Sequence, residues 1–370
     1  MTLKLDIEQL EPALATLSKI TQAASNSPVY KCVMMVYKGG KLRLRGTDLI
    51  TFYETVIDCE VVGTDVTEGS WLVVFEPLHH YVRTSKGTLE LDFKDNVVEM
   101  RSGQDKATAK LRDTSDFTPW HNWKELTPLA CDPIELADAI KQALPSVSTS
   151  LITPQLYNVS LLVGKTSIDV QASNSFKYQV QTLSKKGKDE THLLLPHNAA
   201  IRFADLSSDL KEVGYAPSLL GFRGAKSVYY FRLSTDAAKY PVFRDMPIAK
   251  ATLTVELPKD ELNAVLAKAL GFTENDYKQI NLSFDVKKKT VTLAATSMDF
   301  GSYVGSLKAK SITGDADLLI TVDGNYLQSF VKGAQADTIK LDFTDHRGAI
   351  KIEDIKRPNL LYVMFPLLKA

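Results

Sequence analysis

The sequence contains one short pattern three times: Leu10-Glu11-Pro12-Ala13-Leu14, Leu136-Ala137-Asp138-Ala139-Ile140 and Leu262-Asn263-Ala264-Val265-Leu266. Each copy has large apolar residues at its first and fifth positions, and a further apolar residue follows at the eighth. This spacing is typical of one buried face of a helix. Each copy begins 126 residues after the one before, so the chain is predicted to consist of three units of about this length.

The length and composition are those of a globular protein. The 370 residues suffice for three domains, and each repeat is long enough to bury its own core. Hydrophobic residues make up 44% and charged residues 24%, and no apolar run approaches the roughly 20 residues that cross a bilayer. The stretch 1–6 lacks the apolar core of a signal peptide. We therefore expect a cytoplasmic protein with no membrane partner.

Charge and cysteine content argue against several kinds of site. Lys plus Arg equals Asp plus Glu at 44 each, whereas a protein that holds DNA mainly by neutralising phosphates is usually basic. The cysteines Cys32, Cys59 and Cys131 have no CxxC spacing and are interpreted as free thiols. His79 and His80 would diverge by about 100° on a helix, with no further ligand at metal-binding spacing. No metal and no cofactor are expected.

The first repeat sets the expected order of elements. A helix follows Asp6, and Pro12 must lie in or near its first turn or kink the helix. After a hairpin turn at 38–40, one long strand is predicted over 50–62 and a second helix over 76–85. Each repeat is thus helix, strands, helix, strands.

The other two repeats follow the same order. Asp132-Pro133-Ile134-Glu135 marks the start of a helix, and Gly271 is placed to end another. Second helices are predicted over 196–206 and 325–333. Two helices packed on antiparallel sheets in each repeat predict an α+β fold with three tandem similar domains. Their predicted bounds are 1–127, 128–248 and 249–370.

An ordered set of motifs along nearly the whole chain matches one family. These motifs are Leu44-Arg45-Gly46-Thr47-Asp48-Leu49, Arg101-Ser102-Gly103, Asp116-Phe117, Tyr240-Pro241 and Tyr362-Val363-Met364-Phe365-Pro366-Leu367. In order and spacing they resemble the bacterial sliding clamp, the beta subunit of DNA polymerase III. The resemblance implies a DNA clamp fold in which each chain forms half of a ring, closed as a head-to-tail homodimer.

The resemblance also implies a function without catalysis. The ring would encircle duplex DNA irrespective of sequence and act in DNA replication as a processivity factor. Its implied partners are the replicative DNA polymerase, a separate clamp loader and other proteins with a clamp-binding motif; the chain itself has no GxxxxGK[ST] phosphate loop. Zero net charge agrees with sliding, because tight phosphate contacts would hinder it. The alternative is a clamp-fold scaffold that binds partner peptides but does not hold DNA.

Cations on or beside the predicted helices are the candidate DNA contacts. Lys19 lies nine residues after Leu10, about 180° round the helix, and would face the hole. Arg83 matches a DNA-contacting arginine of the family. The full set is Lys19, Arg83, Lys86, Lys141, Arg202, Lys268 and Lys332. The alternative for each is an ordinary solvated helix charge.

The resemblance implies a hydrophobic cleft for partner peptides between the second and third domains. Matched residue by residue, the cleft consists of Leu156, Ser173, Ser175, Tyr178, Pro241, Met246, Tyr277, Val363, Met364, Phe365, Pro366 and Leu367. Val363 and Phe365 lie on one face of a predicted strand and Met364 lies on the other. One of these two faces is expected to point into the core.

Three departures identify the chain as a divergent member. Ser175-Phe176-Lys177-Tyr178 stands where the family usually has Gly-His-Arg-Leu and is expected to narrow or reshape the cleft. The loop 24–27 lacks an arginine often found there. Ala107 and Ala109 replace bulkier residues at the implied dimer interface, and Phe272 of the opposing subunit is expected to compensate.

Overall fold

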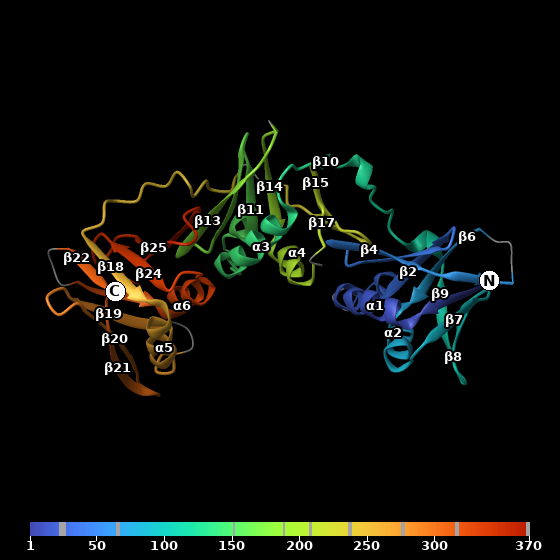
Figure 1. Ribbon diagram of the computed structural model, residues 1–370, viewed down its shortest axis with the longest axis horizontal. Coiled ribbons are helices and arrows are strands. Elements are labelled where there is room, and N and C mark those ends of the chain that lie inside the picture. The colour runs from blue at the N-terminus through green and yellow to red at the C-terminus, as the bar shows by residue number, and fades with distance from the viewer. Residues whose placement is uncertain are drawn as a thin grey trace. The chain divides into compact units, whose positions relative to one another are not determined.

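The structure is a computed structural model in which the chain forms two compact units. Unit 1 contains Met1–Ala137 and Asn198–Thr235, and unit 2 contains Asp138–His197 and Asp236–Ala370. Figure 1 labels their elements. The residues described are 1–21, 27–63, 67–150, 152–187, 189–206, 209–235, 239–274, 278–314 and 318–367. Within these ranges no helix has the length and apolar character needed to cross a membrane.

Unit 1 is built on one antiparallel sheet. Its described strands, in spatial order, are β10 (Thr127–Pro128), β15 (Glu212–Ala216), β16 (Leu219–Arg223), β17 (Ser227–Arg232), β4 (Thr51–Asp58), β3 (Lys41–Thr47), β2 (Cys32–Lys38), β6 (Glu68–Val74), β9 (Asp105–Arg112), β8 (Val97–Ser102), β7 (Thr88–Phe93), β1 (Thr2–Asp6) and β5 (Glu60–Val62). The helices α1 (Ile7–Thr21) and α2 (Phe75–Thr84) pack against each other and against this sheet, α1 on β3 and β4 and α2 on β2 and β9 (Figure 1).

Unit 2 contains two antiparallel sheets. The larger has the described order β14 (Thr191–Pro196), β11 (Asn158–Val163), β12 (Ser167–Ser173), β13 (Lys177–Ser184), β26 (Leu360–Met364), β25 (Ile350–Asp354), β24 (Thr338–Phe343), β18 (Leu253–Pro258) and β22 (Ser311–Gly314). The smaller has the order β21 (Gly301–Lys308), β20 (Thr290–Ser297), β19 (Gln279–Asp285) and β23 (Leu319–Asp323). The helices α5 (Lys259–Leu270) and α6 (Gly324–Gly333) pack against each other and, with both sheets, enclose a hydrophobic core.

The predicted second domain contributes strands to both units. Strand β4 pairs with β17 in unit 1, and β13 pairs with β26 in unit 2, so the sheets continue across both predicted boundaries. Of the three cuts between the units, one falls in α3 (Pro133–Ala143), one in α4 (His197–Ala200) and one after Thr235. The three-domain bounds therefore remain a prediction.

The repeated helical stripe is core packing. Leu10, Leu14 and Leu17 of α1 are fully buried. The matching positions of α3 and α5 are at most 1% exposed; they are Leu136, Ile140, Ala143, Leu262, Leu266 and Ala269. Burial of large aliphatic side chains is the main stabilising contribution of such a stripe. The predicted face is confirmed in all three helices.

Two helix ends predicted from the sequence agree with the structure. The carboxylate of Asp132 accepts the backbone N–H groups of Ile134 and Glu135 at 2.8 and 3.1 Å, which caps α3 as predicted. Gly271 ends α5, although with a right-handed φ of −66° and not the left-handed conformation that usually selects glycine. Pro12 is the sixth residue of α1, so it lies beyond the first turn.

A polar turn repeats in the structure at the 126-residue spacing. In the first copy, Thr47 Oγ1 accepts the N–H of Leu49 at 2.8 Å, and Leu49 has a φ of 72°. In the second, Ser173 Oγ accepts the N–H of Ser175 at 3.2 Å, and Ser175 has a φ of 76°. Asp48 and the corresponding Asn174 each accept the backbone N–H groups of the residues two and three positions later. Short polar side chains of this kind hold a turn in place.

Two predicted elements differ from the structure. The strand over 50–62 is broken at Cys59, whose N–H donates to the carbonyl of Gly40; β4 pairs with β3, but β5 crosses to pair with β1. The helix over 196–206 is a four-residue helix, α4, followed by the 3-10 turn Ile201–Asp205. Local patterns cannot show which edge a strand joins.

Candidate functional site

An aromatic cluster lies in unit 2 where β13 meets β26. Its buried members, called here the Tyr178 cluster, are Leu156, Tyr178, Val180, Leu194, Tyr240, Phe243 and Val363. The rings of Tyr178 and Phe243 stack with centroids 5.1 Å apart, and Tyr240 meets Phe243 edge-on at 5.9 Å. Val363 lies directly across the strand pair from Tyr178. The cluster therefore joins two strands far apart in sequence.

Polar contacts hold the segment 239–248 against this cluster. The backbone N–H of Phe243 donates to Oε1 of Gln171 at 2.8 Å. The guanidinium of Arg244 reaches the carboxylate of Asp169 at 2.7 Å. The hydroxyl of Tyr240 faces backbone carbonyls of β11 and β12, and burial raises its pKa, so it remains a donor. The aromatic rings are thus fixed by strands beneath them.

Large apolar side chains are exposed around the Tyr178 cluster. Phe176 is 57% exposed, and Val242, Met246 and Phe365 are each 38–39% exposed. The N–H of Phe365 donates to the carbonyl of Phe176 at 2.9 Å, and its ring centroid lies 6.5 Å from that of Tyr178. A cavity of about 330 Å³ shares the residues that flank the cluster, Ile248, Ala349 and Leu361. Exposed apolar side chains beside a cavity are typical of a binding surface.

The predicted cleft residues take different places in unit 2. Leu156, Tyr178 and Val363 belong to the Tyr178 cluster. Met246 and Phe365 lie on its exposed rim, Pro241 is half-buried beside Tyr240, and Ser173 and Ser175 form the turn before β13. Pro366 is buried, and Leu367 donates its N–H to the carbonyl of Thr321 at 2.8 Å. Tyr277 lies outside the described residues.

Met364 is placed differently from its neighbours. It is 1% exposed and packs in the core formed by α5, α6 and both sheets of unit 2. Alternation along β26 sends its side chain to the face opposite Val363. No side-chain surface of Met364 is left for a peptide, so we omit it from the proposed groove.

Sequence reasoning missed several residues of this surface. Of the segment Tyr240-Pro241-Val242-Phe243 the sequence predicts only Pro241 as a cleft residue, yet Tyr240 and Phe243 supply two of the three cluster rings. The sequence signal that could have indicated their role is the presence of two aromatic residues three positions apart in the segment between predicted domains. Phe176 was named as a departure but not as part of the surface.

Lys177 occupies the other face of β13 and is 2% exposed. Its ammonium lies 4.6 Å from the ring centroid of Tyr326 and 5.8 Å from that of Tyr362. Burial lowers its pKa to about 8, and the nearby carboxylate of Asp323 opposes that shift. A charge held by two aromatic faces is a cation–π arrangement.

The candidate DNA-binding cations lie at the ends of helices. Lys19, Arg83, Lys268 and Lys332 are exposed in the last turns of α1, α2, α5 and α6, and Lys86 is exposed just after α2. Lys141 is half-buried and lies 3.3 Å from the carboxylate of Asp138. Arg202 is half-buried in the 3-10 turn after α4. Cations in a last turn also stabilise the helix dipole, which accounts for the pattern without DNA.

Two candidate interface residues lie on the open-edged strand β9, and the third, Phe272, lies after α5 and packs on the open-edged strand β21. On β9, residues 105–110 pair with β8 on one side only, because β6 pairs with residues 111 and 112. Ala107 is half-buried, and Ala109 is buried opposite Val98. In unit 2, β21 is the edge of the smaller sheet, and its Tyr303 stacks on Phe272 at 5.8 Å.

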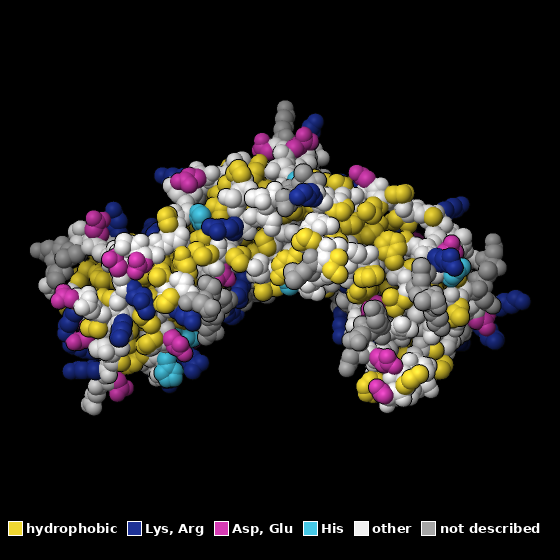
Figure 2. Space-filling view, turned by 180° about the vertical axis from the view of Figure 1, so that it is seen from behind, with side chains coloured by type: hydrophobic (Ala, Val, Ile, Leu, Met, Phe, Trp, Pro, Cys, Tyr) yellow, Lys and Arg dark blue, Asp and Glu magenta, His cyan; other side chains and the backbone are white. Residues whose placement is uncertain are grey.

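Charges on the molecular surface are mixed. On the face drawn in Figure 2, Lys and Arg are interspersed with Asp and Glu. Among the described residues no group of three or more His, Cys, Asp or Glu is arranged to hold a metal. His79 stacks on Phe75 at 5.2 Å, and burial lowers its pKa.

Comparisons with known proteins identify the fold. No family model and no curated protein matches the sequence. Solved structures do match over 100% of both chains: a DNA polymerase sliding clamp from Bacillus subtilis (TM-score 0.91, 16% identity), a griselimycin-bound sliding clamp, DNA polymerase III subunit beta, from Pseudomonas aeruginosa (0.90, 14%), and the DNA polymerase III beta subunit from Thermotoga maritima (0.84, 16%). The chain therefore has the fold of the bacterial sliding clamps, at low sequence identity.

Proposed function

We propose that the chain is a DNA sliding clamp, a non-catalytic processivity factor that encircles duplex DNA as a head-to-tail homodimer in the cytoplasm. The observation that carries this proposal is the full-length likeness to sliding clamps at TM-scores of 0.84 to 0.91. The motifs that resemble the family in sequence agree with it. The replicative polymerase, a clamp loader and other clamp-binding proteins are the proposed partners.

Two open strand edges support ring closure. Residues 105–110 of β9 and the whole of β21 have unpaired backbone groups on one side among the described strands. Such edges are templates for pairing with another chain. If β9 of one subunit pairs with β21 of the next, the contact is head-to-tail, and two subunits close it. Val304, 70% exposed on β21, would then be covered.

The helix-end cations support weak, sequence-independent DNA contacts. Arg83, Lys268 and Lys332 project from separate helices and are exposed. Lysine and arginine in such positions contact phosphates without reading bases. Zero net charge keeps the total phosphate attraction small. The ring, and not the charge, would retain the DNA.

The Tyr178 cluster and its exposed rim form the proposed partner-peptide groove. Phe176, Met246 and Phe365 offer apolar contacts around a stacked aromatic floor. Short peptides bind such preformed grooves through a few apolar anchors. The same groove is expected to receive the polymerase and the other partners in turn.

Retention on closed DNA tests the proposal. The protein is loaded onto a nicked circular plasmid and the complex is passed through a sizing column, before and after linearisation with a restriction enzyme. A clamp stays on the circle and leaves the linear form by sliding off its ends. Equal loss from both forms would contradict the proposal.

A clamp-fold scaffold is the second candidate, favoured by the zero net charge. It predicts that partner peptides bind while DNA is released equally from circles and linear molecules. The same column experiment, combined with a peptide titration, separates the two functions.

A further inference from the structure

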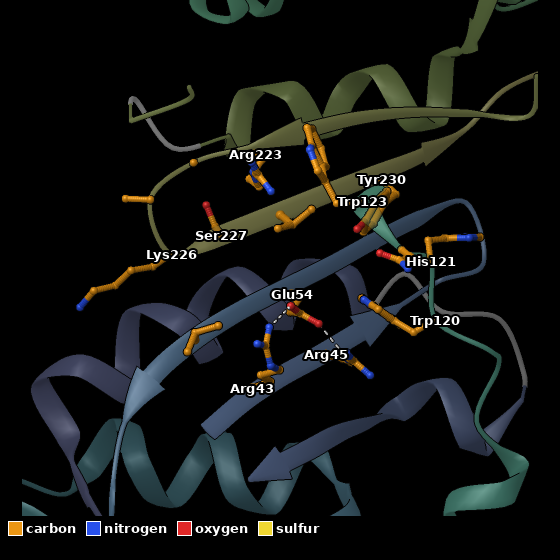
Figure 3. Close-up of a pocket in the computed structure, with 15 residues that line it drawn as sticks. Arg43, Arg45, Glu54, Trp120, His121, Trp123, Arg223, Lys226, Ser227 and Tyr230 are labelled. Atoms are coloured by element: carbon orange, nitrogen blue, oxygen red, sulfur yellow. Dashed lines mark hydrogen bonds and ion pairs between the residues drawn. The ribbon is translucent and has the colours of Figure 1, made fainter. Parts of the chain in front are cut away.

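A cavity of about 510 Å³ lies in unit 1, whereas the Tyr178 cluster lies in unit 2. Three parts of the chain line it: β3 and β4, the segment 120–123, and the β16–β17 hairpin (Figure 3). Its principal side chains, called here the Trp120 pocket, are Arg43, Arg45, Trp120, Trp123, Arg223 and Tyr230. A cavity of this size is large enough for a peptide side chain and its flanking backbone.

The Trp120 pocket repeats the construction of the Tyr178 cluster. Phe52 lies across the β4–β17 pair from Tyr230, as Tyr178 lies across the β13–β26 pair from Val363. Phe52 and Tyr178 are 126 residues apart, the spacing of the helical repeat.

The covering segments repeat as well. Trp120 and Trp123 are three positions apart, as are Tyr240 and Phe243. In the first copy the earlier ring of the pair, Trp120, meets Phe52 edge-on at 5.7 Å, and in the second the later ring, Phe243, stacks on Tyr178 at 5.1 Å. The chain has therefore formed an aromatic floor under a connecting segment twice.

The charge of the Trp120 pocket differs from that of its counterpart. Arg43, Arg45, Arg223 and Lys226 line it, and Glu54 is the acidic side chain among the lining residues. At the positions 126 residues later, Arg43 and Arg45 correspond to Asp169 and Gln171, and Glu54 corresponds to Val180. The first copy of the groove is cationic where the second is not.

The arginines are positioned around one carboxylate. Glu54 accepts from Arg43 at 2.9 Å and from Arg45 at 2.6 Å, as the dashed lines in Figure 3 show. Arg223 pairs with Glu212 outside the lining. The side chains of Arg43 and Arg223 remain 46% and 39% exposed, so each has donors that can reach a ligand. Guanidinium groups bind carboxylates in bidentate fashion.

The aromatic faces favour a peptide over a nucleobase. Arg45 lies over the ring of Trp120 at 5.2 Å, and Arg223 lies over that of Trp123 at 4.9 Å. Phe117 stacks on Trp120 at 6.1 Å. Bases bound by stacking need an uncovered aromatic face. Here Arg45 and Phe117 pack on Trp120 and Arg223 packs on Trp123, so the ring edges are the surface offered to an aliphatic or aromatic side chain.

One polar atom in the lining lacks a partner. Nε2 of His121 is buried without a hydrogen bond in the part of the chain that the structure describes. Its ring is held by Phe52 at 4.4 Å and Tyr230 at 5.5 Å. Burial lowers the pKa of His121 and raises that of Tyr230 to about 12, so both are neutral hydrogen-bonding groups. Buried polar atoms normally have a partner, which a bound peptide could supply.

We propose that the Trp120 pocket is a second docking site, for an acidic peptide segment that inserts one apolar side chain between Trp120 and Trp123 and pairs its carboxylates with Arg43 and Arg223. The choice of a peptide as ligand rests on the proposed function of the Tyr178 cluster as a peptide groove. The existence of the cationic pocket does not depend on that proposed function. Each chain would then hold two partner segments of different charge at once.

Fluorescence anisotropy with a labelled peptide, Glu-Glu-Asp-Leu-Phe-Asp, tests the proposal on the full chain. The double variant Arg43→Gln with Arg223→Gln is expected to weaken binding about tenfold or more, because two charge-assisted contacts are lost. The matched control is Lys124→Gln with Lys211→Gln, which removes two exposed cations of unit 1 outside the lining. Equal weakening by the control would overturn the proposal.

Three further measurements separate the alternatives. Glu54→Gln is expected to tighten peptide binding, because it releases Arg43 and Arg45; unchanged or weaker binding in a folded variant counts against the site. Phe365→Ala is expected to leave this peptide unaffected, and a loss there would assign it to the Tyr178 cluster. If twelve-residue oligothymidylate binds through Arg43 and Arg223 while the peptide does not bind, the ligand of the Trp120 pocket is a nucleic acid and not a peptide. Failure of DNA retention on circles would leave these binding results unchanged.

Discussion

Replacing Lys177 by methionine should stabilise the protein at neutral pH. The lysine is 2% exposed, and burial lowers its pKa from 10.5 to about 8. That shift corresponds to about 3 kcal/mol of unfavourable free energy when the side chain is charged in both the folded and unfolded states. Cation–π contacts with the faces of Tyr326 and Tyr362 stabilise the charged lysine by about 1 kcal/mol, and methionine cannot make these contacts. Lys177→Met should therefore raise the free energy of unfolding by about 2 kcal/mol at pH 7.

The effect should depend on pH with a definite sign. Between pH 8 and 10.5 the folded chain binds fewer protons at Lys177 than the unfolded chain does, so wild-type stability rises with pH. Below pH 8 the full penalty is present. The advantage of Lys177→Met should accordingly shrink by about 2 kcal/mol between pH 7 and pH 9.5.

Urea unfolding followed by circular dichroism at pH 7.0, 8.0, 9.0 and 9.5 measures both quantities. Subtracting wild type from variant cancels the tyrosines and cysteines that titrate at high pH. Lys165→Met, at an exposed lysine in the same unit, is the control and should give no pH-dependent difference. A Lys177→Met variant that is no more stable at pH 7, with a constant difference across the series, would refute the reasoning.

Four further outcomes are expected. Phe365→Ala with Met246→Ala should weaken binding of a partner peptide by about 1–3 kcal/mol in a titration, with the dimer mass unchanged; unaltered affinity would remove the rim from the groove. Arg83→Gln should speed loss of the protein from circular DNA and lower the salt slope of binding by about 1, whereas an unchanged slope means no phosphate contact. Val304→Asp should convert the dimer to a 41.0 kDa monomer by light scattering, because a carboxylate would be buried beside the paired edge; a persisting dimer would place the interface elsewhere. Asp354→Ala should lower the free energy of unfolding by about 3 kcal/mol in urea, because this buried carboxylate accepts hydrogen bonds from backbone N–H groups and from an arginine. Burial alone would raise the pKa of Asp354, but these donors lower it. The stability that Asp354 contributes to the wild type should therefore be present at neutral pH and be lost as acid protonates the carboxylate.

Periodic features of the chain were predictable from sequence. The stripe led by Leu10, the cap at Asp132 and the turn around Asp48 each depend on residues within a few positions of one another. Their physical causes are local, so the 126-residue spacing could reveal them in each copy. The family resemblance then identified the fold that the structural comparisons confirm.

Features that depend on distant pairing were not predictable. The strand over 50–62 changes partners at Cys59, and no local pattern marks that crossing. Lys177 reads as a turn cation, yet it is buried because α6 and β26 bring Tyr326 and Tyr362 against it. Phe243 likewise looks like part of a domain boundary in the sequence, because the residues that bury it, Tyr178 and Gln171, are distant along the chain. In each case a segment more than 50 residues away decides the environment.

The pairing of β13 with β26 also sets when the protein can finish folding. Tyr178 has no strand partner on its open side until Val363 is synthesised, 185 residues later. Thr55 has no partner on its open side until Ser227 is synthesised, 172 residues later. At a synthesis rate of about 5–20 residues per second, each strand edge stays open for roughly ten seconds or more on the ribosome. Contacts of such long range also slow folding after release. The nascent chain therefore carries an open edge at β4 until β17 is made and an open edge at β13 until its last residues emerge, and it should depend on chaperones more than its finished stability suggests.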